Sequence, residues 1–434
     1  MGMEINIRDN MFGDLGGTRM PRMVKVQQVF EIARLEDIDG AIEGQISKPE
    51  IQRLIRPAMN IAVLIGSRGI AHIARIAKKT IDELKKLGAN PFIVPAMASH
   101  GGATESGQRA ILASYGISEE TMGVEIRCDM EPELVGQTQY EVNIYFDQNA
   151  LRADGIVPIN RIKCHTAFRG ETESGLMKMI AIGCGKQKGA DSLHGYGADK
   201  FATLLPDAYD VIRGKTNILF GMGIVENAVE ETALIEAIPS DAFREREAEL
   251  LVFANRLMPR IQIDNFDGLI VHETGKNFSG DGMDPNITGR FAVPGMTGGP
   301  SYQRMALLDC SEETHGNAVG MGLADVIPRR LLAKADFSQM YMNAFTSKMV
   351  TPIVKIPMVA KDDWEAIAVM LGICCRVEKG REKIVAIKNT LELGTIWISE
   401  SLLSEINDDP RFRVIGEAQE IPFDQHGRCL LFDE

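Results

Sequence analysis

The chain has 434 residues, of which 45% are hydrophobic and 25% are charged, and its formal net charge is −13 at pH 7. This length exceeds that of most single domains, so we expect two or three domains. No stretch approaches the roughly 18 uninterrupted apolar residues of a membrane span, and the N-terminus lacks the pattern of a signal peptide. The acidic charge argues against nonspecific nucleic-acid binding. We therefore expect a cytoplasmic globular protein without a nucleic-acid or membrane partner.

The cysteines indicate a reducing compartment. Their number is odd, no pair has the CxxC spacing, and no zinc-ribbon or iron–sulfur pattern is present. Free thiols are therefore the simplest interpretation. The seven cysteines are Cys128, Cys164, Cys184, Cys310, Cys374, Cys375 and Cys429.

The first half of the chain predicts strands and helices that alternate. Apolar runs bounded by Gly, Pro or Asn indicate buried strands, and apolar residues at helical spacing indicate helices. Such an alternation is typical of an open parallel sheet. Strands are predicted over 60–66, 91–96, 153–160 and 217–225, and helices over 70–87, 103–116 and 240–258, the last with Ser240 as its N-cap.

A second unit is predicted to start near Ile263. A strand over 266–273 is followed by a loop over 275–291 that is rich in glycine and aspartate. The remaining predicted elements are a helix over 326–347, an extended segment over 351–359, a helix over 361–375, and a short-stranded tail over 395–434 that could return to the first domain.

These elements predict an α/β protein of two domains. Each domain is expected to hold a mainly parallel sheet flanked by helices, with the active site in the cleft between the domains. Residues 1–262 form the N-terminal cofactor domain in this prediction, and residues 263–394 form a smaller C-terminal domain.

Two histidines follow predicted strands, where open parallel sheets bind their ligands. His100 lies in SHGG (99–102), directly after the strand 91–96, and His165 follows the strand 153–160. Histidine is well suited to proton transfer near pH 7. The loop of His165 also holds a cluster of cations that is unusual in an acidic chain, namely Arg161, Lys163 and Arg169. Either histidine could instead lie in a solvated loop, so both interpretations stay open.

The other histidines have plainer settings. His72 lies inside the predicted helix 70–87, and His426 lies in a polar tail, so we expect structural or solvated roles for both.

Lys178 lies in the apolar segment SGLMKMIAIGCG, and His194 lies between polar and glycine residues in GADSLHGYG. A buried lysine has a shifted pKa and suits covalent chemistry, but a lysine at a helix end can also extend to solvent. His194 is either a metal ligand or a turn residue. The segments GCGKQKG (183–189) and GMGIVENA (221–228) lack the spacing of phosphate loops, so an ordinary dinucleotide domain is poorly supported.

Taken in order, these residues resemble the nickel-dependent lactate racemase family, most strongly from about 60 to 200. SRG (67–69) resembles the family's Thr-Arg motif, and SHGG (99–102) resembles its Gly-x-His segment. His165 falls where the family has a second catalytic histidine. Lys178 and His194, 16 residues apart, resemble the lysine that carries the cofactor and the histidine that binds nickel.

The resemblance implies a nickel-pincer nucleotide, joined to Lys178 and completed by His194 as the metal ligand. Imidazole suits nickel. His100 and His165 would be the two acid–base groups of a 2-hydroxy acid racemase or epimerase, which exchanges hydride reversibly with the cofactor. Ser67 and Arg68 would contact the cofactor. Arg68, Arg169 and Lys276 would bind a small anionic substrate, and separate maturation enzymes would supply the cofactor.

The departures from the family surround the substrate. The family's Thr-Arg-Pro is Ser-Arg-Gly here, and the loop 275–291 has no clear counterpart. We therefore expect retained cofactor chemistry and a substrate other than lactate. Lys163, Arg169 and Arg290 would suit a larger or more acidic hydroxy acid. The sequence leaves open which acid is used, whether the enzyme is a racemase or an epimerase, and how many chains associate.

Other classes of function stay open at this point. One is an NAD-dependent 2-hydroxy acid dehydrogenase. Another is a zinc- or iron-dependent hydrolase or lyase with His100, His165 and His194 around the metal. The last is a non-catalytic relative that binds a nucleotide.

Overall fold

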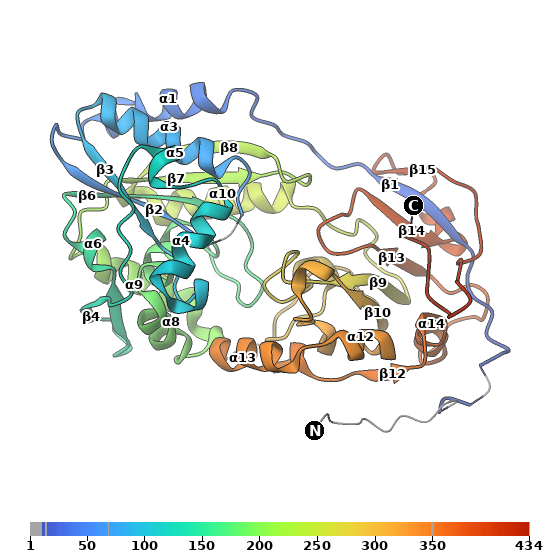
Figure 1. Ribbon diagram of the computed structural model, residues 1–434. Coiled ribbons are helices and arrows are strands. Elements are labelled where there is room, and N and C mark those ends of the chain that lie inside the picture. The colour runs from blue at the N-terminus through green and yellow to red at the C-terminus, as the bar shows by residue number, and fades with distance from the viewer. Residues whose placement is uncertain (1–10, 14, 68, 349–350, 434) are drawn as a thin grey trace. The chain divides into compact units, whose positions relative to one another are not determined.

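The computed structural model describes residues 11–13, 15–67, 69–348 and 351–433. It divides the chain into an N-terminal unit, Glu31–Met258, and a C-terminal unit formed by Pro259–Glu434 together with the residues up to Phe30. Each unit contains a mainly parallel sheet with helices against it (Figure 1). The predicted α/β class is therefore confirmed.

The sheet of the N-terminal unit runs in the order β3-β2-β6-β7-β8. All its neighbours are parallel except β8, which is antiparallel to β7. The four strands predicted from apolar runs are all present, because a strand that is covered on both faces needs apolar side chains on both. The five strands of the sheet are these four, β2 Asn60–Ile65, β3 Asn90–Pro95, β6 Gly155–Arg161 and β7 Phe220–Glu226, and β8 Thr232–Pro239, which was not predicted.

Helices cover both faces of this sheet. The buried isoleucines of α1 and α3 pack on one face with residues of β2, β3 and β7. Gly221 of β7 leaves room on the other face for Leu176 of α7 and Phe243 of α10. The helices are α1 Ile38–Ile46, α2 Pro49–Gln52, α3 Ile73–Lys86, α4 Glu105–Ser114, α5 Glu119–Met122, α6 Gln148–Leu151, α7 Leu176–Lys178, α8 Lys186–His194, α9 Phe201–Arg213 and α10 Phe243–Leu257. A hairpin, β4 Glu133–Gln137 and β5 Asn143–Phe146, lies beside α8.

Two predictions about helix ends in this unit are wrong. His72 does not lie inside α3 but is its N-cap, with a left-handed φ of 60°. Ser240 does not cap the long helix, because it begins a 3₁₀ turn (Ser240–Ala242) and Ala242 is the N-cap of α10. Helix starts of this kind depend on backbone angles that apolar spacing does not reveal.

The sheet of the C-terminal unit runs in the order β12-β11-β10-β9-β13-β14-β1-β15. It is parallel from β12 to β13 and antiparallel from β14 to β15. The strands are β1 Met23–Gln28, β9 Gly268–Thr274, β10 Arg304–Cys310, β11 Val326–Pro328, β12 Met358–Ala360, β13 Ile384–Ile387, β14 Thr395–Ser399 and β15 Phe412–Val414. The helices are α11 Pro285–Thr288, α12 Arg329–Lys334, α13 Phe337–Ser347, α14 Asp363–Gly372 and α15 Leu403–Ile406.

The single helix predicted over 326–347 is wrong. The segment starts as strand β11, and α12 and α13 follow with a break at Ala335. Pro328 ends the strand, and Asp336 caps α13 by accepting hydrogen bonds from the backbone of Ser338 and Gln339. The extended segment predicted over 351–359 is mostly a 3₁₀ turn, with only β12 extended at its end.

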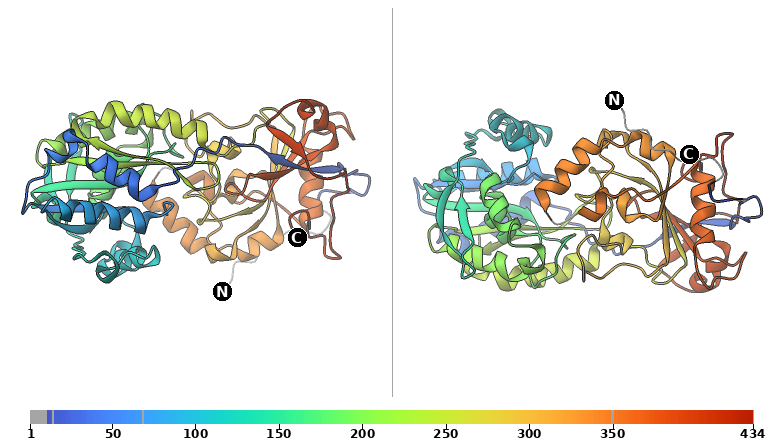
Figure 2. Two further views of the ribbon diagram at one scale, coloured as in Figure 1. Left: turned by 90° about the horizontal axis from the view of Figure 1, so that it is seen from above. Right: turned by 90° about the horizontal axis from the view of Figure 1, so that it is seen from below.

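The two ends of the chain correct the predicted domain borders. Residues 395–434 do not return to the N-terminal unit, because β14 pairs with β13 and with β1 inside the C-terminal sheet. The residues around β1 belong to the same sheet, which places the blue strand among the red ones (Figures 1 and 2). Pairing between strands this distant in sequence leaves no local signal. In the part of the chain that the structure describes, no helix is long and apolar enough to cross a membrane.

The placement of β1 predicts unequal behaviour of the two units as fragments. Residues 31–258 hold a complete sheet and are expected to fold alone. Residues 259–434 lack β1, which lies between β14 and β15, so this fragment is expected to unfold at a clearly lower temperature than the same fragment with an added peptide of residues 15–30. Trp397 pairs with Lys25 of β1, so its fluorescence reports docking. Equal melting temperatures with and without the peptide would contradict this.

Candidate functional site

Three of the predicted site residues lie in loops at one edge of the N-terminal sheet. Ser67 follows β2, His100 follows β3 and His165 follows β6. These strands are parallel neighbours in the order β3-β2-β6, so the three loops leave the sheet side by side at its carboxyl edge. This is the edge where open α/β sheets bind ligands. Arg68 lies outside the described residues, so its predicted contacts stay a prediction.

The loop of His100 is held by a buried glutamine from the next helix. The Gln108 side-chain amide donates to the carbonyl oxygens of Ala98 at 3.0 Å and of His100 at 3.4 Å. Gly101 has a φ of 70°, and a Cβ on it would lie 2.5 Å from the backbone of Gly107. Only glycine allows this close approach. The His100 side chain is exposed at the end of the strand.

The His165 loop, residues 165–173, is ordered by one carboxylate. Glu173 is buried, and it accepts the backbone N–H of His165 at 2.5 Å. Burial raises the pKa of Glu173, while the backbone hydrogen bond from His165 and the charge of Arg169 act in the opposite direction. The Arg169 guanidinium donates to the His165 carbonyl oxygen at 2.7 Å and lies 3.5 Å from the Glu173 carboxylate. Arg169, predicted to bind substrate, therefore has a structural role in its own loop.

Lys178 ends the short helix α7, and a π-helix, Met179–Gly183, follows directly. Such π-helical turns occur often at functional sites. The buried Glu247 of α10 accepts the backbone N–H groups of Leu176 and Met177, which start α7. A Cβ on Gly175 would lie 2.8 Å from that carboxylate, so glycine makes the contact possible. The Lys178 side chain is half-buried.

The segment that carries Lys178 is joined to the loop of His100. The backbone N–H of Ala98 donates to the carbonyl oxygen of Gly183 at 3.0 Å. A Cβ on Gly183 would lie 2.5 Å from the Ala96 carbonyl oxygen. The fully buried Lys186 donates to the Pro95 carbonyl oxygen at 2.7 Å and pairs with Asp147 at 2.9 Å. The segment 183–189 therefore serves packing and cannot offer its first lysine to a phosphate.

An aromatic row links His165 with His194. The His165 ring lies 4.4 Å from Phe168, Phe168 lies 5.6 Å edge-on from Phe201, and Phe201 stacks on His194 at 5.5 Å with an angle of 15° between the planes. Phe201 is fully buried at the start of α9. One packed row of rings thus orients two of the predicted site histidines.

Other predicted residues are placed by contacts inside their own units. Arg161 pairs with Glu226. Lys276 lies in the C-terminal unit, after β9, and its amine donates to the Gly280 carbonyl oxygen at 2.5 Å. Its substrate role stays a prediction.

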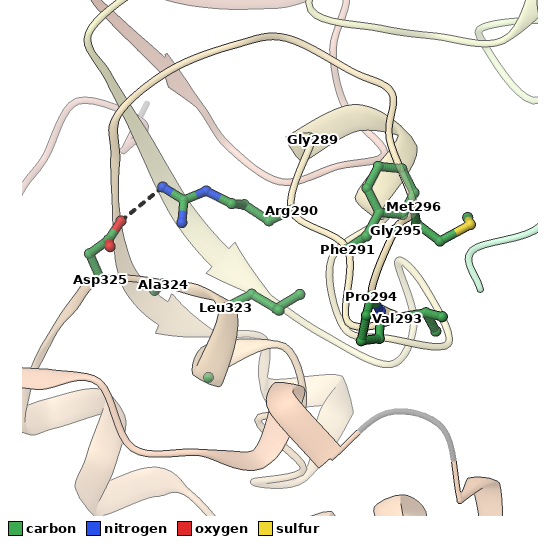
Figure 3. A pocket seen from close by; sticks show the side chains of 11 residues that line it. Gly289, Arg290, Phe291, Val293, Pro294, Gly295, Met296, Leu323, Ala324 and Asp325 are labelled. Carbon is green, nitrogen blue, oxygen red and sulfur yellow. Dashed lines mark hydrogen bonds and ion pairs between the residues drawn. The ribbon is translucent and has the colours of Figure 1, made fainter. Parts of the chain in front are cut away.

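Arg290 lies beside a cavity of about 520 Å³ in the C-terminal unit. Its guanidinium points to Asp325 at 3.0 Å (Figure 3) and donates to the Gln303 carbonyl oxygen at 2.9 Å. Phe291 and Met296 lie on the loop that borders the same cavity. The charge of Arg290 is therefore matched locally by a carboxylate.

Two alternative sites, a phosphate loop at 221–228 and a metal site of three histidines, are not supported by the described residues. Gly221 and Gly223 lie inside β7 and face buried side chains, so the segment 221–228 is a strand and not a phosphate loop. Among the described residues, no three His, Cys, Asp or Glu side chains form a group that could hold a metal ion. His100, His165 and His194 are all described and do not form such a group, so the three-histidine zinc or iron site lacks support.

Three residues of the site were not predicted from the sequence. Glu173, Glu247 and Phe201 have no motif around them, and their partners are 8 to 71 positions away or on other elements. The one feature of the sequence that could have indicated them is an acidic residue among apolar or cationic neighbours. Glu173, which follows the cationic residues of its loop, is an example.

A family model and a solved structure that resemble this chain are both described as lactate racemase. Residues 18–200 match the model of a family described as the lactate racemase N-terminal domain. Among solved structures, the lactate racemase apoprotein from Thermoanaerobacterium thermosaccharolyticum is similar, with 14% sequence identity and a TM-score of 0.53 over 86% of this chain and 99% of that chain. At this identity the likeness shows the fold. No curated protein sequence matches the chain.

Glu247 is expected to make stability depend on pH. Burial raises its pKa from the ordinary 4.5 to about 8, so the folded chain favours the neutral carboxyl. Its contribution is complete below pH 4.5 and is lost as the pH rises to about 8. The E247Q variant keeps an acceptor without titrating, so the wild type is expected to lose stability relative to E247Q across this range, by about 1.4 kcal/mol for each pH unit at most.

Urea unfolding at several pH values, followed by circular dichroism, measures this difference. The matched control is E249Q, because Glu249 lies on the same helix at the surface. Parallel pH profiles for the wild type and E247Q would contradict the assignment.

Proposed function

We propose that this chain, whose residues 18–200 match the model of the lactate racemase N-terminal domain, is an isomerase that inverts one stereocentre of a small 2-hydroxy acid. The observation that carries the proposal is the joining of the Lys178 segment to the loop of His100 through the Ala98–Gly183 hydrogen bond. That bond lies at the sheet edge from which the loops of Ser67 and His165 also leave. The residues that the family's chemistry requires are thus on connected elements.

The donor set fits a nickel-pincer nucleotide. Lys178 offers a half-buried amine on a helical turn with a fixed start, and amines suit covalent attachment. His194 offers an imidazole whose plane is set by Phe201, and imidazole is a good nickel ligand. When bound, this group supplies a reversible acceptor for the hydride of the substrate's C2. In this proposal Lys178 holds the cofactor, His194 is the protein ligand of the metal, and maturation enzymes load it.

His100 and His165 are the proposed acid–base groups. They follow β3 and β6, the two neighbours of β2 in the sheet, so they approach the centre of the edge from either side. Each moves the hydroxyl proton of one stereoisomer at the substrate's oxygen. Ser67, between them, is fixed by its carbonyl oxygen, which accepts the Tyr115 hydroxyl at 2.6 Å.

The proposed substrate is an anionic 2-hydroxy acid other than lactate. The support is the altered motif at 67–69 and the loop 275–291, both of which belong to the predicted surroundings of the substrate. Arg169 and Arg290 each also pair with a carboxylate of their own unit. Arg68, Arg169 and Lys276 are the cations that we propose for the substrate carboxylate.

Mass spectrometry of the intact protein from its native source tests the cofactor. We expect an added mass that maps to Lys178, together with nickel near one atom per chain, and K178A is expected to lose both. K215A is the matched control, because Lys215 is exposed and distant in sequence from the site. Native protein of unmodified mass that nevertheless interconverts the isomers of a 2-hydroxy acid would refute the cofactor.

Loss of optical purity tests the activity. Single enantiomers of a panel of 2-hydroxy acids are incubated with the loaded enzyme and separated by chiral chromatography, without added NAD. H100A and H165A are expected to lower the rate about 10²- to 10⁴-fold, as removal of a general acid–base group does, while H426Q is not. Activity that depends on NAD would instead indicate the dehydrogenase.

A further inference from the structure

The backbone of His165 is held at both ends by one pair of side chains. Its N–H donates to the Glu173 carboxylate at 2.5 Å, and its carbonyl oxygen accepts from Arg169 at 2.7 Å. Arg169 and Glu173 are themselves 3.5 Å apart. The three residues therefore form a closed ring of interactions. The Glu173 side chain is only 4% exposed, so water competes weakly for its bond to the His165 N–H.

The His165 imidazole accepts a hydrogen bond that decides which of its two nitrogens carries the proton. The backbone N–H of Ala167 donates to Nδ1 of His165 at 3.0 Å. A neutral imidazole has one N–H donor and one acceptor nitrogen. Because Nδ1 is the acceptor, the neutral ring carries its proton on Nε2. The Phe168 ring, 4.4 Å away, restricts rotation of the imidazole out of this geometry.

We propose that Glu173, with Arg169, is a positioning residue that fixes the His165 loop so that Ala167 holds the imidazole in its Nε2–H tautomer. The positioning of the loop does not depend on the proposed function. Only the part that His165 plays in a reaction rests on it. Carboxylates that orient a histidine usually bind the ring itself. Here the Glu173 carboxylate binds the backbone of His165, and the backbone N–H of Ala167 binds the imidazole.

The consequence for the reaction is an unequal pair of histidines. With its proton on Nε2, the neutral His165 ring can donate a hydrogen bond to the substrate's oxygen. To accept a proton at Nε2, the neutral ring would need its own proton on Nδ1, and that N–H would face the N–H of Ala167. In this resting state the ring that is ready to accept the first hydroxyl proton is that of His100. His165 can accept one at Nε2 only after its own proton has moved to Nδ1 and the Ala167 hydrogen bond has opened.

Nuclear magnetic resonance of the unloaded chain, with ¹⁵N-labelled histidine, tests the tautomer directly. Long-range ¹H–¹⁵N correlations report which ring nitrogen carries the proton, and H165Q assigns the signal. The wild type is expected to show one Nε2–H species for His165. E173A is expected to broaden or split this signal as the loop loosens, and E173Q, whose amide oxygen still accepts the His165 N–H, is expected to restore most of it.

The matched control is E171A, because Glu171 is an exposed carboxylate in the same loop. The signals of the exposed His72 and His426 show whether each variant is folded. An Nδ1–H tautomer in the wild type, or an unchanged His165 signal in folded E173A, overturns the proposal. In the loaded enzyme, E173A is expected to lower kcat about 10²-fold with little change in KM, as a small misplacement of a catalytic group does.

The two proposals fail separately. A chain with no isomerase activity but a fixed Nε2–H tautomer that depends on Glu173 would refute the function and keep the positioning role. An active isomerase whose His165 signal ignores E173A would keep the function and refute the positioning role.

Discussion

The hydrogen bond between the Ala98 amide and the Gly183 carbonyl oxygen is the contact on which the site depends. It joins the loop after β3 to the π-helix after Lys178, two segments that are far apart in the chain. The bond requires that Gly183 have no side chain, because a Cβ would meet the Ala96 carbonyl oxygen at 2.5 Å. The buried Lys186, paired with Asp147, fixes the same segment from the other side. An amine and a histidine loop are thereby held together before any ligand binds.

Buried acidic side chains do the positioning in this acidic chain. Glu247 orders the start of α7, Glu173 orders the His165 loop, and Asp147 caps α6 while pairing with Lys186. Each accepts backbone N–H groups, which offsets the cost of its burial. The side chains that would carry chemistry, at 165 and 178, lie on backbone that such a carboxylate holds. Orientation is therefore built into the fold of the N-terminal unit, on rigid elements.

The sequence predicted the parts of the fold that local chemistry determines. Apolar runs located β2, β3, β6 and β7, and the order of strands and helices indicated the α/β class. It missed what distant contacts decide: the pairing of β1 with β14, and the strand at Val326–Pro328 inside a predicted helix. The same holds for the site. Residue types and spacing indicated the histidines and Lys178, whereas Glu173 and Glu247 matter only through backbone groups that folding brings to them.

The cationic loop shows that residue type alone does not reveal which groups a charged side chain contacts. Lysines and arginines after a strand suggest an anion site, and the net charge of −13 makes such a cluster conspicuous. Yet Arg161 is paired with Glu226 and Arg169 with Glu173. An arginine whose charge is matched by a buried carboxylate attracts a substrate carboxylate weakly, because the pair presents little net charge. The same arginine is an effective structural donor, since its planar fork bonds several oxygens at once. These two charges therefore serve the packing of their own loops.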